Sequence, residues 1–177
     1  GVLANGFAGG PYTVTATAGG KNTAFTLTNT RAPQAALTAT ATPNPIAYNT
    51  ASTLGATGGT GSGAVTFALD ATDLTAANYC TLAANTVTAK LAGGSCSIIA
   101  TKAGDANYTP ASATVVVSTT KAAQTGFAAQ ATPAAIEVNG LSVLSTTGGQ
   151  STAQAVFVVA PASSAVCVLE SATQLRG

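Results

Sequence analysis

The sequence predicts an all-β fold made of repeated β-sandwich units. Short stretches in which apolar residues alternate with Thr or Ser occur throughout the 177 residues, which is the pattern of half-buried strands. Gly-rich turns separate these stretches at the spacing expected of a sandwich. The chain also resembles itself at an offset of about 90 residues, so we expect the same unit more than once.

The repeat becomes visible when the chain is shifted against itself by 90 residues. Residues 34–67 then fall on residues 124–157, and identical residues coincide along the whole stretch. The coinciding pairs include Gln34 and Gln124, Pro43 and Pro133, Ile46 and Ile136, Ser52 and Ser142, Leu54 and Leu144, and Phe67 and Phe157. Further along, Cys80 falls on Cys167 at an offset of 87, which places a length change in a loop.

The start of the chain matches the end of the same unit. Val14 and Ala16 fall on Ile98 and Ala100 at an offset of 84. The sequence therefore predicts three parts. Residues 1–31 are the closing strands of an incomplete repeat, residues 32–121 are a complete repeat, and residues 122–177 are the opening strands of another incomplete repeat.

The complete repeat is expected to contain seven strands, and comparison of the copies assigns their faces. Val14 and Ile98 are equivalent positions in two copies of the repeat, and both are apolar, so their side chains should point inward. Their neighbours Thr15 and Ile99 should face outward. A unit of about 90 residues with seven short strands has the size of an immunoglobulin-like sandwich. The strands are expected near residues 35–42, 51–57, 64–70, 79–83, 85–90, 96–103 and 112–119.

The beginning and the end of the chain lie at equivalent positions of the repeat. Leu3, Val87 and Leu175 are equivalent, so the chain is expected to begin and end inside the same strand. We expect either a segment of a longer array or ends that are completed by strands from a neighbouring molecule.

Three cysteines allow one internal pair. Cys96 shares strand parity with Ile98, and Cys80 shares it with Leu82, so both thiols should enter the core and form a disulfide. Tyr12 stands at the place of Cys96 in the first copy. Cys167 matches Cys80 and is expected to be unpaired, or to have its partner outside the chain. A metal site or a nucleophile is disfavoured, because there is no His and no CxxC motif.

The residues around the cysteines resemble a known family of repeats. They are similar to the bacterial immunoglobulin-like repeats of very large secreted and surface proteins, of adhesin-like and autotransporter-like type. The resemblance rests on Cys80, on the runs 85–88, 92–96 and 103–108, and on the N-terminal runs 4–6, 8–16 and 25–29. It implies tandem immunoglobulin-like sandwiches, one complete and two partial, in an extracellular protein at the cell surface or secreted.

Composition excludes several classes of function. The formal net charge is +1 and only 6% of the residues are charged, so electrostatic binding of nucleic acid is not expected. No run of about 18 apolar residues predicts membrane insertion. Without His, and without a paired set of carboxylates, we expect no enzyme, no cofactor and no metal.

One loop is a candidate for ligand binding or for a contact between domains. Asp105, Asn107 and Tyr108 could bind sugar hydroxyls and stack on a ring, but they are better explained as caps of a turn and a cover for the end of the sandwich. Two further ideas, calcium at Asp70, Asp73 and Asp105 and phosphate in the glycine-rich run 58–63, lack the ligand clusters that these ions need.

The functional expectation is mechanical. The first hypothesis is a stalk or spacer in adhesion, in which neighbouring repeats of the same chain are the partners. The second is a filament, in which subunits join head to tail by strand complementation between partial domains. The third is a module that binds carbohydrate or a host surface, although the sequence identifies no glycan. The group of exposed aromatic residues that is usual in such a module is not expected, because most of the four Tyr and five Phe lie at inward parity.

Overall fold

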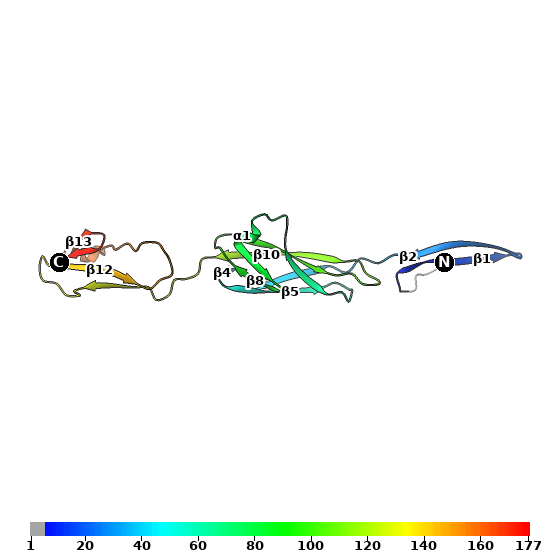
Figure 1. Cartoon of the computed structure of the whole chain (residues 1–177), viewed down its shortest axis with the longest axis horizontal. Helices are drawn as coiled ribbons and strands as arrows, with labels where there is room; N and C mark the ends of the chain where they lie inside the picture. Colours follow the sequence, from blue (N-terminus) through cyan, green and yellow to red (C-terminus); the bar gives the residue numbers. More distant parts are fainter. Residues whose placement is uncertain (1–5) are drawn as a thin grey trace. The chain divides into compact units, whose positions relative to one another are not determined.

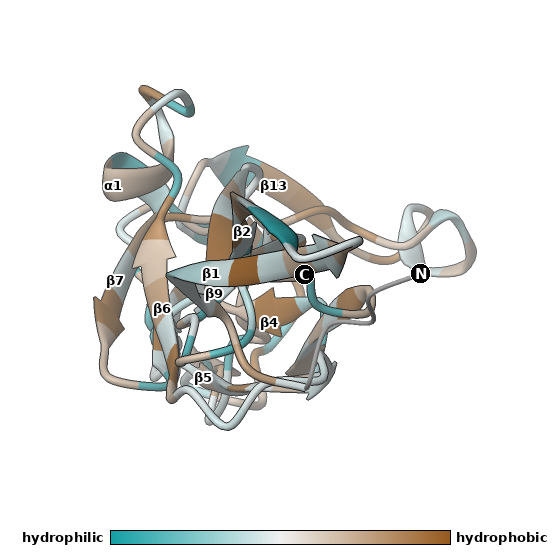
Figure 2. Cartoon of the chain, turned by 90° about the vertical axis from the view of Figure 1, so that its right-hand side faces the viewer, coloured by the Kyte–Doolittle hydropathy of each residue, from teal (hydrophilic) through white to brown (hydrophobic). Residues whose placement is uncertain are grey.

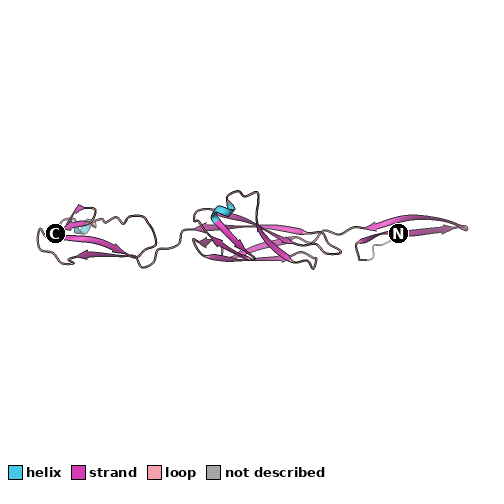
Figure 3. Cartoon of the chain, in the orientation of Figure 1, coloured by secondary structure: helices cyan, strands magenta, loops and turns pink. Residues whose placement is uncertain are grey.

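The computed structural model describes residues 6–177, which are mostly β-strand with one short α-helix (Figure 3). Their sheets are antiparallel apart from one short parallel pair of strands and an isolated bridge. The chain divides into two compact units, Gly1–Ala122 and Ala123–Gly177. The prediction of an all-β chain is therefore confirmed.

The first unit begins with a two-stranded hairpin. Strand β1 (Gly9–Ala18) pairs with β2 (Lys21–Asn29), and the two run side by side (Figure 1). Gly19 and Gly20 connect them with φ of 56° and 74°, which glycine adopts readily and which matches the twist of a tight hairpin. Val14 lies opposite Phe25 in this pairing.

The same unit then forms two four-stranded sheets. The first sheet has the order β3-β5-β8-β7, and the second has the order β4-β10-β9-β6. The bounds of the first are β3 Leu37–Thr42, β5 Ala51–Gly58, β8 Thr86–Ala89 and β7 Cys80–Ala83. Those of the second are β4 Ile46–Ala47, β10 Ala111–Thr120, β9 Ser95–Lys102 and β6 Val65–Leu69. Each of the seven expected strands is present.

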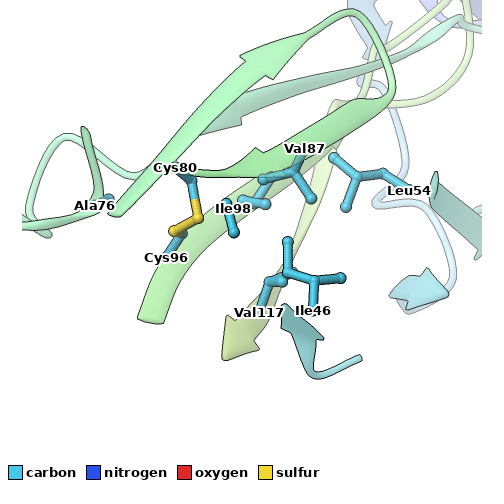
Figure 4. Close-up of a cluster of buried hydrophobic side chains, with 9 residues drawn as sticks. Ile46, Leu54, Ala76, Cys80, Val87, Cys96, Ile98 and Val117 are labelled. Atoms are coloured by element: carbon cyan, nitrogen blue, oxygen red, sulfur yellow. A yellow bond between two sulfur atoms is a disulfide. The ribbon is translucent and has the colours of Figure 1, made fainter. Parts of the chain in front are cut away.

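A buried cluster fills the space between these two sheets. Val87 from the first sheet and Ile98 and Val117 from the second are each 0% exposed. They belong to the same buried cluster as the cystine, which Figure 4 shows beside Ile98. Ile98 is buried, as expected, and Ile99, which was expected to face outward, is partly exposed. Burial of small apolar side chains from both sheets is what holds the sandwich together.

Two elements of the sandwich were not expected from the sequence. Helix α1 (Ala76–Tyr79) occupies the place where a strand was predicted to begin, so that prediction is wrong for Tyr79. The Asp73 carboxylate accepts hydrogen bonds from the N–H groups of Thr75 and Ala76 and so starts this single turn. The other element, β4, pairs in parallel with the end of β10 through Ile46 and Ala47.

The second unit contains one four-stranded sheet with the order β11-β12-β14-β13. Its elements are β11 Ala128–Thr132, β12 Leu141–Thr147, the 3-10 turn η1 Pro161–Ser163, β13 Val168–Ser171 and β14 Gln174–Arg176. Ser142 lies opposite Leu175 here, just as Ser52 lies opposite Val87 in the first unit. The sheet thus reproduces β3-β5-β8-β7 in order and, apart from an irregularity between Leu169 and Ser171, in register. The third residue of this equivalent set, Leu3, lies outside the described residues.

Candidate functional site

The disulfide between Cys80 and Cys96 is present, as predicted. Cys80 begins β7 in the first sheet and Cys96 lies on β9 in the second, so the bond joins the two layers of the sandwich. Their Cα atoms are 6.2 Å apart, and the two residues are 1% and 0% exposed. A buried bond between layers resists their separation. Tyr79 packs beside this core, and its ring lies so close to Gly94 that a Cβ there would collide with it.

Cys167 is a free thiol in the second unit. It is partly exposed, and its Sγ lies 3.4 Å from the carbonyl oxygen of Ser163, to which the thiol donates. It directly precedes β13, as Cys80 begins β7, so the two cysteines occupy equivalent places.

The loop of Asp105 is built around one carboxylate. One oxygen accepts hydrogen bonds from the N–H groups of Asn107 and Tyr108, each at 2.9 Å. The other accepts from the N–H of Ser62 at 2.7 Å and from its hydroxyl at 3.2 Å. The side chain therefore ties the loop to the glycine-rich turn between β5 and β6. Because both oxygens are occupied by the protein, little capacity remains for a ligand.

These hydrogen bonds determine how Asp105 titrates. The N–H of Ser62, followed by that of Asn107, stabilises the charged form and lowers the pKa of Asp105 from 3.8 to about 2. Asp105 therefore remains ionised well into the acid range, and its carboxylate serves as a fixed acceptor.

Asn107 and Tyr108 contact the segment that enters the sandwich. The carbonyl of Asn107 accepts from the N–H of Ala32 at 2.8 Å, and Ala32 forms a bridge with Tyr108. The amide oxygen of Asn107 also accepts from the N–H of Ala8 at 3.1 Å. A shallow pocket beside them is lined partly by Phe7 and Tyr108. These residues lie where the hairpin meets the complete repeat.

Gln34 was not singled out from the sequence, yet it is central to this junction. Its side-chain N–H donates to the carbonyls of Ala103 and Thr109, both at 3.0 Å, and its oxygen accepts from the N–H of Gly61 at 3.0 Å. The signal that could have indicated this role is its identity with Gln124 in the repeat.

The glycine-rich run 58–63 is a turn whose groups bond to the protein itself. The N–H of Gly61 donates to Gln34 and that of Ser62 to Asp105, while Lys102 donates to the carbonyls of Gly58 and Gly59 at 3.3 Å. A phosphate in this turn would need backbone N–H donors. Those of Gly61 and Ser62 already donate to side chains of the protein.

Asp70 and Asp73 lie in neighbouring turns before α1. Hydrogen bonds from Thr72 lower the pKa of Asp70, and one from Thr75 is the largest cause of a lowered pKa at Asp73. Asp73 also accepts from the N–H of Ser97 on β9 at 3.1 Å, which anchors the turn to the second sheet. Ser97 also donates to Asp70, through its hydroxyl, so these two carboxylates share one partner. Asp105 is bound to a different loop, so the three carboxylates considered for calcium do not converge on one site among the described hydrogen bonds.

The aromatic side chains are more exposed than expected. Most Tyr and Phe were expected to point inward, but five of the nine are at least 47% exposed. The exposed ones are Phe7, Tyr12, Phe25, Tyr48 and Phe127. That expectation is wrong because parity places Tyr12 and Phe25 on one face of a hairpin that has no second layer above it.

Comparison of the chain with protein-family models, with curated proteins and with solved structures finds no match. Across residues 6–177, no helix has both the length and the apolar character needed to cross a membrane.

Proposed function

We propose that this chain is a non-catalytic stalk or spacer region of an extracellular bacterial surface protein involved in adhesion. In this proposal its units are immunoglobulin-like repeats, one complete and two partial. Two observations support this assignment. Two facing sheets are joined by an internal disulfide, and the sequence resembles such repeats. Buried disulfides of this kind persist in oxidising compartments, which supports a location outside the cytosol.

The single observation that carries the proposal is the path of the chain through the complete repeat. The chain enters beside Tyr108, where Ala32 forms its bridge, and leaves after Thr120, where β10 pairs with β4. Strand β10 runs between these two places and has ten residues, which corresponds to about 33 Å. Entry and exit therefore lie at opposite ends of the sandwich, as a spacer requires.

The junction at the entry end supports the same role. Asp105, Asn107 and Gln34 direct their polar groups to backbone atoms of the loop and of the entering segment. Such contacts stiffen a joint between successive units. A ligand-binding loop would keep several of these groups free.

The proposal is tested on the cells that produce the protein. Antibodies raised against the 177-residue chain should label intact cells, and the labelled antigen should be much larger than the 16.9 kDa of this segment. Glycan arrays and host-cell binding assays with the isolated chain should give no specific signal. Antigen confined to the cytosol would contradict the location, and saturable glycan binding would support the carbohydrate-binding alternative instead.

A further inference from the structure

The described strands contain two parallel contacts, and both involve the first and the last segments of the complete repeat. At the entry end, Ala32 forms a parallel bridge with Tyr108, just before β10. At the exit end, β4 pairs in parallel with Thr119 and Thr120 of β10. The other pairings among the described strands are antiparallel. The parallel contacts therefore join the part of the chain that enters the repeat to the part that leaves it.

The contact at the exit end extends beyond the two paired residues of β4. The Asn44 side chain donates through its N–H to the carbonyl of Val116 at 2.8 Å and accepts from the N–H of Ser118 at 3.0 Å. On the other side of β4, the N–H of Tyr48 donates to the carbonyl of Thr120 at 2.8 Å. These partners alternate along β10, as groups at one edge of a strand do. The Asn44 amide therefore acts as one more residue of β4.

Apolar packing closes the inner side of this contact between residues 44–48 and 116–120, which we call the exit contact. Ile46 and Val117 are both buried and belong to the core cluster drawn in Figure 4. Figure 2 shows β4 as a short brown, apolar segment. Because water is kept from the inner side, hydrogen bonds of the contact are not readily exchanged for bonds to water there.

Under the proposed function, on which this inference rests, tension passes along the chain from one unit to the next. It then pulls Ala32 away from the entry end and Thr120 away from the exit end. Strands β4 and β10 are parallel and are loaded from opposite ends, so they must slide past each other before they separate. Hydrogen bonds between strands run across this direction, and sliding loads them together, whereas peeling would break them one at a time.

We infer that the exit contact is the element that sets the force at which the complete repeat unfolds. The disulfide has a different role. Cys80 and Cys96 both lie between β4 and β10 in the sequence, so their bond limits extension after rupture and does not tie these two strands to each other. Asn44 is the residue that separates the two roles, because its side chain contributes two hydrogen bonds that can be removed without changing the backbone.

The test is unfolding of the full chain at constant force, with the chain held by its two ends. Unfolding of the complete repeat is recognised by a gain in length that increases when the disulfide is reduced. Asn44→Ala should make this event about tenfold faster than in the unmodified chain at the same force, which is the effect expected from the loss of two hydrogen bonds.

The matched control is Asp73→Ala, which removes hydrogen bonds from outside the exit contact. The Asp73 carboxylate accepts from the N–H groups of Ala76 and Ser97, each at 3.1 Å. Urea unfolding should show that both variants are folded and that Asp73→Ala loses at least as much stability as Asn44→Ala. At constant force, however, its unfolding rate should stay within about twofold of the unmodified chain, because these bonds are not loaded when β4 and β10 slide.

Reduction of the unmodified chain gives a second readout. It should increase the gain in length and leave the unfolding rate within about twofold, since a disulfide acts mainly on the unfolded chain. Equal acceleration in Asn44→Ala and Asp73→Ala would overturn the inference, as would an Asn44→Ala chain that unfolds at the unmodified rate. Acceleration by reduction as large as that of Asn44→Ala would assign the load to the disulfide instead. None of these results bears on surface labelling, so the two proposals fail separately.

Discussion

The Asp105 carboxylate accepts four hydrogen bonds from the protein, two on each oxygen. Its pKa of about 2 in the folded chain lies below the ordinary value of 3.8. A lowered pKa stabilises the fold at pH values above the unfolded pKa, and that stabilisation is lost as the pH falls through the folded pKa. The relevant window is therefore about pH 4 to 2.

Replacement of this residue tests that linkage. Asp105→Asn should lower the thermal midpoint at pH 6, because one acceptor oxygen becomes an amide N–H group facing Ser62. At pH 2 the difference from the unmodified chain should shrink. Both proteins should still lose stability in acid, since Asp70 and Asp73 also have lowered pKa values. Identical acid profiles for the two proteins would contradict the role assigned to Asp105.

Removal of the cystine should destabilise the complete repeat. The bond closes a loop with a sequence separation of 16, and the chain-entropy estimate for such a loop is roughly 3 kcal/mol. Urea unfolding of the Cys80→Ala, Cys96→Ala double variant should show a loss of that order. Cys167→Ala is the matched control, and it should change stability by less than about 0.5 kcal/mol because this thiol is partly exposed and unbridged. Equal losses in both proteins would contradict this account.

Parity along single strands predicted the two buried cysteines, because alternation is a local property of the sequence. The role of Gln34 was not predictable in the same way. Its partners Gly61, Ala103 and Thr109 are 27 to 75 residues away, and only the folded chain brings them together. The exposure of Tyr12 and Phe25 was missed because parity gives a face but does not say whether a second layer covers it.

At the scale of elements, the passage from β3 to β4 depends on Asn44. Its side-chain N–H donates to the carbonyl of Val116 at 2.8 Å, and its oxygen accepts from the N–H of Ser118 at 3.0 Å. The amide thereby completes the edge of β10 where the chain crosses from one sheet to the other. The equivalent residue of the second unit is Ala134, which has no amide.

Asn44→Ala should therefore destabilise the complete repeat by roughly 1 to 2 kcal/mol, the value of two exposed hydrogen bonds. Asn78→Ala on the exposed face of α1 serves as the control and should stay within about 0.5 kcal/mol. Urea midpoints of the two variants give the comparison. Equal losses of stability in the two variants would contradict the role of the Asn44 side-chain amide at the edge of β10.

Equivalent leucines in the two units provide another test at this scale. Leu54→Ala removes a side chain that is 3% exposed and should cost about 2 to 5 kcal/mol. Leu144→Ala removes a partly exposed side chain and should cost less than half as much. Amide hydrogen exchange in each unit reports the two losses separately. A larger loss at Leu144 would mean that the second unit has a closed core.

The seven expected strands of the complete repeat were predictable because their apolar and polar residues alternate and glycine turns bound them. Helix α1 was not predictable, since a single turn has no helical period and depends on the Asp73 side chain. Strand β4 has two residues, and it becomes a strand only by pairing with β10 more than 70 residues away.

At the scale of the whole molecule, one pattern of strands is used repeatedly. The register of the first sheet recurs in the second unit, and the register of β9–β10 recurs in the N-terminal hairpin. Offsets between matching residues predicted these correspondences.

The most direct test of the account is the force-extension curve of the 177-residue chain held by its two ends. Because the cystine joins the two sheets, it should withhold the 16-residue loop from extension, which shortens the fully stretched chain by about 50 Å relative to the reduced chain. The complete repeat should show a distinct unfolding event, and the gain in length at that event should increase by about 50 Å when the disulfide is reduced. The same gain in both states, or extension without any unfolding event, would contradict a mechanically locked sandwich.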